Sequence, residues 1–367
     1  MENNIIIIGG SHHNTLSMIR SLGDTGYIIT LILVGCRNSF VAYSKYIDNY
    51  YYVNNSIDII SLLVTIKRSI KDILISCSDD VSQIIDLNYN ILSPYYYFFN
   101  CGKEKSLSLF LDKKIQTELA QNLGMNIPKT IKHCSEDSFE VFPCLLKPLE
   151  SVNGGKKIII CKNKDDYKNA LLNFKHTPIL IQEYIEKSSE IVIVGAAYNN
   201  NIVIPGYIYK IREISGGTTY SQVKRISNID LSLIELCKKY IRNLNYNGLF
   251  GIEFIQNKDG LYYFIEINLR NDATTYSIVK AGVNLPLLYC HMISDKRVTI
   301  ESYQLKEIYS IVDFRDLSCA KNLHIPFTSW LRQYFKAECK YIFDFKDMFP
   351  FWKYLFDFVE SKLLNKK

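Results

Sequence analysis

The residues FGIEF at 250–254 and FIEINLR at 264–270 decide the fold that this sequence predicts. Both are apolar runs of strand type, and the turn-forming residues NKDG at 257–260 lie between them, so the stretch predicts a β-hairpin. Because side chains alternate between the two faces of a strand, every second residue of each run lies on the same face. The hairpin can therefore gather the polar residues of both runs on one side.

That polar side carries a set of oxygen ligands. Glu266, Asn268 and Arg270 follow one another at intervals of two, and Glu253 on the partner strand can face them. Two carboxylates and an amide oxygen form a hard ligand set of the kind that Mg²⁺ takes, usually together with nucleotide phosphates. Arg270 beside them can stabilise charge on a transferred phosphoryl group. The alternative interpretation, a cross-strand ion pair at a sheet surface, stays open at this point.

The first hundred residues alternate short apolar runs with amphipathic stretches. Strands are predicted at 5–8, 28–34 and 73–76, and helices at 15–22 and 57–69. This order predicts right-handed βαβ units and a parallel sheet. Ligands of such sheets bind beyond the carboxyl ends of the strands.

The following segment changes to strands interrupted by glycine-bearing loops. Lys147 closes an apolar strand before the loop at 151–156, and a lysine with backbone N–H groups can hold phosphates there. No Walker pattern follows, and an ordinary glycine hairpin is the alternative. Lys113 begins a predicted helix at 111–123, where a solvated helix face is the alternative. Residues 179–184 suit either an adenine-lining hinge or a core strand.

A second set of cations lies before another glycine turn. Lys210 and Arg212 precede SGGT at 215–218, a pattern that suits a substrate carboxylate or phosphate. A hairpin with solvated cations explains the pattern equally well. His12 and His13 follow the first strand near the expected substrate side, and we interpret them as exposed loop histidines. Without a third ligand they do not predict a metal site.

Composition and charge exclude several classes of protein. The 367 residues are 48% hydrophobic and 22% charged, which fits two or three packed domains and excludes a disordered chain. No apolar run approaches the roughly 20 residues of a membrane helix. With no signal peptide recognised and no CxxC pair among the ten cysteines, we expect reduced thiols and a cytoplasmic location. The net charge of +6 is not gathered into runs, so no nucleic-acid partner is expected.

The order of these motifs resembles the ATP-grasp superfamily. Within it, the nearest resemblance is to the carboxylate–amine ligase branch, which includes D-aspartate ligase and carbamoyl-phosphate-synthase-like proteins. The resemblance covers roughly residues 1–300. It rests on DK at 112–113, LKP at 146–148 with its glycine loop, QEYI at 182–185, FGIEF at 250–254 and EINLR at 266–270.

The resemblance implies an architecture that combines α/β and α+β parts. An N-terminal parallel-sheet α/β domain, the pre-ATP-grasp domain, would occupy residues 1–100. A two-lobed ATP-grasp domain would follow at 101–300, with its glycine-loop lobe at about 143–205. An aromatic and irregular C-terminal extension, ending in a helix, would occupy residues 301–367. This helix could dock on a partner subunit or an anionic membrane, but we favour packing onto its own domain.

The resemblance also implies a role for each matching residue. Lys113 and Lys147 would contact the ATP phosphates, and Arg270 would steady an acyl phosphate, so Lys147 and Arg270 would be the catalytic residues. The metal, Mg²⁺ with Mn²⁺ as an alternative, would be bound by Glu253, Glu266 and Asn268. Further contacts to the nucleotide would come from Ser151, Gly154, Gly155, Glu183, Tyr184, Ile185 and Glu190. Contacts to the substrate would come from Lys210, Arg212, Gly216 and Gly217.

These roles imply an ATP-dependent ligase. It would join a carboxylate to an amine through an acyl phosphate, with ADP and phosphate as products. Its partners would be two small molecules, with no nucleic acid and no transmembrane segment, and a homodimer is left open. The alternative function is that of a non-catalytic ATP-binding scaffold or regulatory protein.

Overall fold

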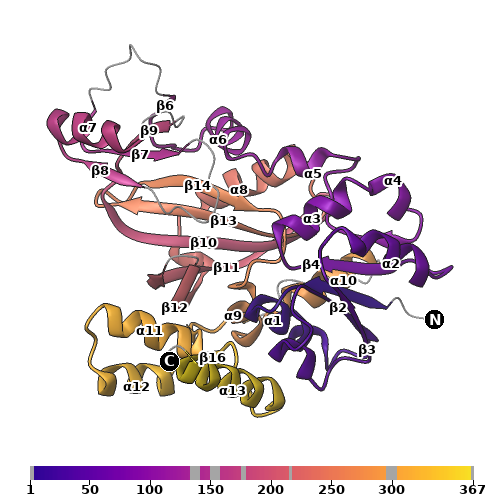
Figure 1. The fold of residues 1–367 in the computed structure, drawn as a ribbon. Helices are drawn as coiled ribbons and strands as arrows, with labels where there is room; N and C mark the ends of the chain where they lie inside the picture. The colour runs from indigo at the N-terminus through magenta and orange to yellow at the C-terminus, as the bar shows by residue number, and fades with distance from the viewer. Residues whose placement is uncertain are drawn as a thin grey trace.

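Three β-sheets organise the described part of the chain (Figure 1). The computed structural model describes residues 4–132, 141–148, 158–174, 179–214, 217–294 and 304–364. A five-stranded sheet belongs to the N-terminal part, a seven-stranded sheet lies in the middle, and a four-stranded sheet lies at the opposite end. The predicted combination of a parallel α/β part with a larger mixed sheet is confirmed. None of the helices within those ranges has the length and apolar character that a membrane crossing requires.

The N-terminal sheet is parallel throughout. In spatial order its strands are β3 (Asn49–Val53), β2 (Ile29–Val34), β1 (Ile5–Gly9), β4 (Asp72–Ser76) and β5 (Tyr96–Tyr97). The central strands are buried on both faces, as expected for β-branched runs in a sheet covered by helices. Because β1 has β2 on one side and β4 on the other, the carboxyl ends of β1 and β4 form the switch point where such sheets bind ligands.

Short helices connect these strands. They are α1 (His13–Leu22), the 3₁₀ turn η1 (Phe40–Tyr43), α2 (Asp58–Ile66), α3 (Asp79–Asp86) and α4 (Tyr89–Leu92). The predicted helices thus exist with shifted ends. Strand β3 is absent from the prediction, because its largely exposed, tyrosine-rich sequence lacks a buried apolar face.

The large sheet is antiparallel except at its last pair. In spatial order its strands are β14 (Tyr262–Asn268), β13 (Gly248–Asn257), β10 (Lys187–Tyr198), β11 (Asn201–Ile214), β12 (Gly217–Arg225), β15 (Tyr309–Ile311) and β16 (Cys339–Lys340). Strands β13 and β14 form the predicted hairpin, with Glu253 opposite Glu266. The predicted glycine turn extends less far than expected, because Gly217 already belongs to β12.

The small sheet has its own core. In spatial order its strands are β6 (Thr130–Lys132), β9 (Ile179–Glu183), β7 (Cys144–Pro148) and β8 (Ile159–Cys161), and α7 (Lys164–Leu171) and the 3₁₀ turn η2 (Leu172–Phe174) pack against them. The predicted glycine-loop lobe at 143–205 includes three of these strands, whereas β10 lies in the large sheet. The loop between β7 and β8 lies outside the described residues.

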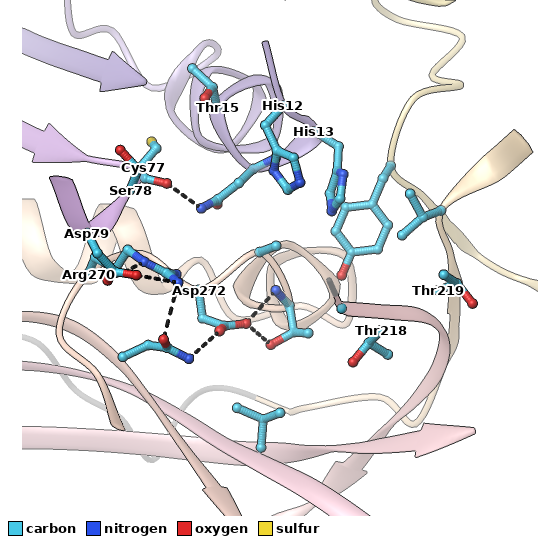
Figure 2. Close-up of a pocket in the computed structure, with 18 of the residues that line it drawn as sticks. His12, His13, Thr15, Cys77, Ser78, Asp79, Thr218, Thr219, Arg270 and Asp272 are labelled. Carbon is cyan, nitrogen blue, oxygen red and sulfur yellow. Dashed lines mark hydrogen bonds and ion pairs between the residues drawn. The ribbon is translucent and has the colours of Figure 1, made fainter. Parts of the chain in front are cut away.

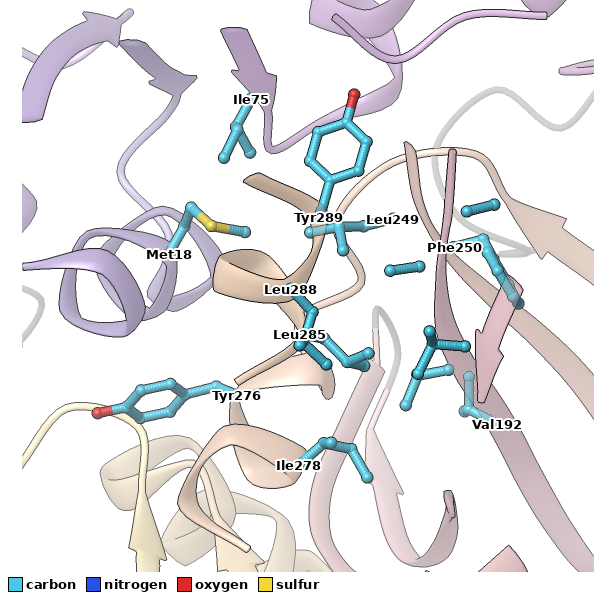
Figure 3. Packing of buried hydrophobic residues seen from close by; sticks show 14 of the residues in the cluster. Met18, Ile75, Val192, Leu249, Phe250, Tyr276, Ile278, Leu285, Leu288 and Tyr289 are labelled. Carbon is cyan, nitrogen blue, oxygen red and sulfur yellow. The ribbon is translucent and has the colours of Figure 1, made fainter. Parts of the chain in front are cut away.

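The N-terminal sheet and the large sheet share one hydrophobic core. Figure 3 shows Met18 and Ile75 of the N-terminal part near Tyr289 of α10 (Leu285–Ile293), with Phe250 of β13 beyond. Because this apolar core is continuous, side chains from both sheets can line one site. The remaining helices of this region are α5 (Ser106–Leu109), α6 (Lys113–Asn122), the 3₁₀ turn η3 (Ile226–Asn228), α8 (Leu231–Asn243) and α9 (Thr275–Lys280).

The prediction of an irregular C-terminal segment is wrong for most of its length. Besides β15 and β16, it contains α11 (Asp313–Asn322), α12 (Phe327–Lys336) and α13 (Phe349–Leu364). The last helix packs onto its own segment, as favoured, and also onto the N-terminal part: Tyr354 stacks on Phe314 of α11 with ring centroids 6.0 Å apart, and meets Phe40 edge-on with ring centroids 5.1 Å apart. Trp352 and Phe356 of the same helix are exposed.

Candidate active site

A cavity of about 790 Å³ lies between the carboxyl ends of β1 and β4 and the large sheet. The N-terminal part, the large sheet with the residues that follow β14, and the C-terminal segment all line it, and Figure 2 shows several of these side chains. His12 and Ser78 come from the N-terminal part, Arg270 and Asp272 follow β14, and Thr218 belongs to β12. The cavity therefore occupies the position expected for a ligand of the N-terminal parallel sheet.

Two glutamates face each other at one end of this cavity. Glu253 lies in register with Glu266, and both line the cavity. Asn268 lines the same end, and its side-chain amide donates to Glu253 Oε1 at 3.4 Å and to Asp272 Oδ2 at 3.2 Å. The predicted metal residues Glu253, Glu266 and Asn268 are therefore brought together in one carboxylate cluster.

Ammonium groups lie against this carboxylate cluster. Lys210 Nζ is 2.6 Å from Glu253 Oε2 and 2.5 Å from Glu190 Oε1. Lys113, at the start of α6, forms an ion pair with Glu266. Burial alone would lower the pKa of Lys210, but the surrounding carboxylates outweigh it and raise that pKa. Burial raises the pKa of Glu253 to about 7, against the attraction of Lys210 and with repulsion from Glu266.

The donors of the carboxylate cluster fit a divalent cation of the magnesium type. Mg²⁺ is usually bound through one or two carboxylates together with substrate phosphates. Glu253 and Glu266 supply the carboxylates, and the side-chain oxygen of Asn268 is a third oxygen donor. Across the described ranges there is no group of three or more His, Cys, Asp or Glu side chains placed to hold a metal. Phosphate oxygens would therefore have to complete the coordination shell.

Arg270 joins the carboxylate cluster to the N-terminal sheet. Its Nε is 2.8 Å from Asp79 Oδ1, its Nη2 donates to Asn268 Oδ1 at 3.1 Å, and its Nη1 donates to the Asn271 carbonyl at 3.2 Å (Figure 2). The sequence places Asp79 at a strand end but does not indicate this partner, because 191 positions separate the two residues. Asp79 orients the guanidinium that the sequence predicts to act on the phosphoryl group.

The predicted nucleotide residues are only partly described. Glu183 ends β9, and its Oε2 accepts the backbone N–H of Lys129 at 3.1 Å. The connection from Glu183 through Tyr184 to Ile185 links the small sheet to the large sheet and does not line the cavity. The backbone of Lys147 lies in β7, but its side chain falls outside the described part. Ser151, Gly154, Gly155 and the predicted substrate residue Gly216 also lie outside the described residues.

Lys210 and Arg212 were predicted to act together, but they lie on opposite faces of β11. Lys210 pairs with Ser221 and Arg212 with the adjacent Tyr220, so β11 carries one extra residue between them. Such a β-bulge turns the following side chain to the other face. Lys210 therefore lines the cavity, whereas Arg212 is buried and binds the carboxylate of Asp316 at 3.0 and 2.6 Å.

The interpretation of both histidines as exposed loop side chains is wrong for His13, which is buried at the start of α1. The rings of His12 and His13 are 3.9 Å apart, and both line the cavity. His12 is exposed to the cavity, but desolvation inside it, together with the charge of Arg315, lowers its pKa to about 4, and burial lowers the pKa of His13 well below its ordinary value. Both imidazoles are therefore neutral at pH 7. Gly217 of the predicted substrate set lines the same cavity.

Comparison with known sequences identifies one domain. Residues 111–274 match the ATP-grasp domain family. The carbamoyl phosphate synthase large chain of Caldanaerobacter subterraneus subsp. tengcongensis is 25% identical over 215 residues, which are 54% of this chain and 20% of that protein. This chain therefore spans about a fifth of that relative's length.

Solved structures show the same fold over most of the chain. The L-amino acid ligase from Bacillus licheniformis superposes with a TM-score of 0.64 at 12% identity, over 85% of this chain and 80% of that one. N5-carboxyaminoimidazole synthetase from Staphylococcus aureus, complexed with ADP, superposes with a TM-score of 0.66 at 16% identity, over 88% and 87%. The order of motifs, the sheets and the matched segment agree with one another: residues 111–274 match the ATP-grasp domain family, and most of the chain shares its fold with these two solved structures.

Proposed function

We propose that this protein is an ATP- and Mg²⁺-dependent ligase that joins a carboxylate to an amine, with ADP and phosphate as products. The observation that carries the proposal is the carboxylate cluster of Glu253, Glu266 and Asn268 with Arg270 bound beside it. A donor set for a cation and a guanidinium for a phosphoryl group thus meet in one cavity that also reaches the N-terminal sheet. Nucleotide binding alone does not require a cavity that continues past the guanidinium.

The chemistry follows from the charges at this end of the cavity. A carboxylate is a poor electrophile, so in the proposed reaction the acid first receives the γ-phosphoryl group of ATP. The amine then attacks the acyl phosphate and phosphate leaves. When bound, Mg²⁺ supplies neutralisation of the phosphate charge. Lys113 and Lys210 add cations, and Arg270, oriented by Asp79, offers planar N–H donors to charge that develops during transfer.

The remaining assignments extend this proposal. Glu183, Tyr184 and Ile185 would frame the adenine, and Lys147 with the loop at 151–156 would contact the phosphates. The fold shared with a synthetase bound to ADP and with an L-amino acid ligase supports a nucleotide site and amine-joining chemistry. The homodimer, the cytoplasmic location and the domain boundaries stay predictions.

An assay of ADP release tests the proposal. ATP and Mg²⁺ are supplied with amino acids in pairs with candidate carboxylates, and turnover with one particular pair is expected. Glu266→Gln, which removes one metal donor charge, should lower this turnover by roughly a hundredfold or more. Glu118→Gln, an exposed residue of α6, is the matched control and should not change it. Silence across the panel, with melting still stabilised by ATP, would favour the non-catalytic scaffold.

A further inference from the structure

We propose that the end of the cavity lined by His12, His13, Arg315 and Tyr341 is a subsite for a substrate carboxylate that is not consumed in the reaction. The inference rests on the proposed ligase and adds the chemical class of one of its substrates. That substrate carries an acid group besides the atoms that react. It is either an amino acid that provides the amine or a dicarboxylic acid that provides the acyl group.

The carboxylate subsite and the carboxylate cluster share one cavity but are built from different elements. His12 is the N-cap of α1 and His13 its first residue, Arg315 lies on α11, and Tyr341 follows β16. Arg270 connects the two ends, because it binds Asn268 at one side and its charge acts on His12 at the other. A substrate whose reacting group lies near Arg270 therefore extends its other end toward the histidines.

His12 presents a hydrogen-bond donor to this space. Its Nδ1 accepts the backbone N–H of Asn14 at 3.1 Å, which caps α1. An imidazole whose Nδ1 accepts and which is neutral carries its proton on Nε2. The neutral state follows from desolvation inside the cavity and from the nearby charge of Arg315. The tautomer is thus determined by the helix cap, and the remaining ring nitrogen can donate to an oxygen of the ligand.

Arg315 supplies the charge of the carboxylate subsite. A guanidinium has five N–H donors, so it can bind a ligand carboxylate in addition to its partners within the protein. The turn of α11 that carries it is held by its neighbour Asp316, which is fully buried and accepts from Arg212 and from Trp330 Nε1. A rigid helix therefore presents the cation to the cavity, as a binding residue requires.

The balance of charge favours a single negative charge on the ligand. Arg315 and Arg270 act on His12 from two sides, but the carboxylate of Asp272 acts on the same ring with the opposite sign. Asp272 is itself bound to Thr274 and Asn268 and does not leave the wall of the cavity. A carboxylate therefore suits the subsite better than a phosphate dianion does.

Kinetics with paired substrates test the inference and separate the two sources of the carboxylate. In one arm, each amino acid that supports ADP release is compared with its α-amide, which keeps the amine and removes the charge. In the other arm, succinate and glutarate are compared with their monoamides. We expect one arm to lose roughly tenfold or more in kcat/KM on amidation. In Arg315→Met, the ratio of kcat/KM for the acid to kcat/KM for its amide should be close to one, and the KM for ATP should not change.

Two further variants separate binding from folding. Lys321→Met removes an exposed cation from the same helix outside the cavity, and should leave the acid-to-amide ratio of kcat/KM unchanged. His12→Asn keeps a capping acceptor and a side-chain donor, so it should retain more of the preference for the acid than His12→Ala does. Melting temperatures without substrates identify any variant that fails for lack of stability.

The outcomes for the ligase and for the carboxylate subsite are distinguishable. Turnover that is equally fast with acids and amides overturns the subsite and leaves the ligase intact. If no pair gives turnover, the same amino acids and dicarboxylates are tested as stabilisers of melting in the presence of Mg²⁺ and a non-hydrolysable ATP analogue. Stabilisation that Arg315→Met abolishes then supports the subsite although the ligase is contradicted, and no stabilisation by either class overturns the subsite as well.

Discussion

Removal of the Asp316 carboxylate tests whether Arg212 is held for structure or for substrate. Asp316 is fully buried and binds Arg212 Nε and Nη2 at 3.0 and 2.6 Å. It also accepts from Thr219 Oγ1 at 2.7 Å and from Trp330 Nε1 at 2.9 Å. Asp316→Ala therefore leaves a guanidinium that is 6% exposed without its carboxylate and removes the acceptor of two further donors.

The expected loss follows from the cost of an unpaired buried charge. Breaking a buried ion pair by removing one partner costs about 3–5 kcal/mol. Each donor left without an acceptor adds about 1–3 kcal/mol, although such contributions are not additive within one network. We therefore expect Asp316→Ala to lower the free energy of unfolding by about 4 kcal/mol or more. The double variant Arg212→Met with Asp316→Leu should be much more stable than Asp316→Ala, since replacing both members of a buried ion pair by apolar groups is often nearly neutral.

Urea unfolding followed by tryptophan fluorescence measures this loss directly. Trp330 donates to Asp316, and the only other tryptophan of the sequence, Trp352, is exposed and can be replaced by Phe in all variants. Unfolding of Asp316→Ala at the urea concentration of the parent protein would refute the reasoning. If Arg212→Met left stability unchanged but raised the KM of a substrate, Arg212 would belong to the substrate site as the sequence predicted.

Three further outcomes follow from the same structure. Asp79→Asn should lower kcat by roughly tenfold with an unchanged KM for ATP, because Arg270 loses its orienting partner; an unchanged kcat would contradict that role. The free energy of unfolding should fall as the pH drops below about 6.5, because His13 has a lowered pKa in the folded protein and so takes up a proton more readily in the unfolded chain. His13→Gln should therefore reduce the dependence of the melting temperature on pH, and an unchanged dependence would assign it to other groups. Mg²⁺ and ATP together should raise the melting temperature by more than the sum of their separate effects, and simple additivity would argue against the exchange of partners at Glu266 described below.

The polar face of the hairpin could be predicted from the sequence, and one neighbouring strand could not. The period of two places Glu253 opposite Glu266 because the register from Gly251 to Glu253 is regular, and the irregularity of this pair begins only after Glu253. The same rule puts Lys210 and Arg212 on one face of β11, yet a β-bulge between them separates the two side chains. A bulge depends on the register with the next strand, and no residue type at 210–212 indicates it in the sequence.

Contacts between distant segments escape the sequence for a related reason. Asp79 reaches Arg270 only because the shared core brings the N-terminal sheet against the large sheet. His13 is buried because the C-terminal segment covers it: Tyr341 lies edge-on to its ring at 5.1 Å. The prediction of an irregular C-terminal segment fails for two reasons: β15 and β16 are too short to show a periodic pattern, and the amphipathic pattern of α12, which the sequence does carry, is missed among the aromatic residues.

The carboxylate cluster is already neutralised in part by the protein, and this determines how nucleotide and metal would bind there. The network contains three ammonium groups and four carboxylates: Lys113, Lys187, Lys210, Glu190, Glu213, Glu253 and Glu266. A cation that binds Glu266 must compete with Lys113, and a phosphate that attracts Lys113 must draw it away from Glu266. A metal alone would therefore leave Lys113 without its carboxylate, and a phosphate alone would leave Glu266 without its ammonium group. If both were bound, Glu266 would have the metal and Lys113 would have phosphate in place of each other, so neither charge would lack a partner.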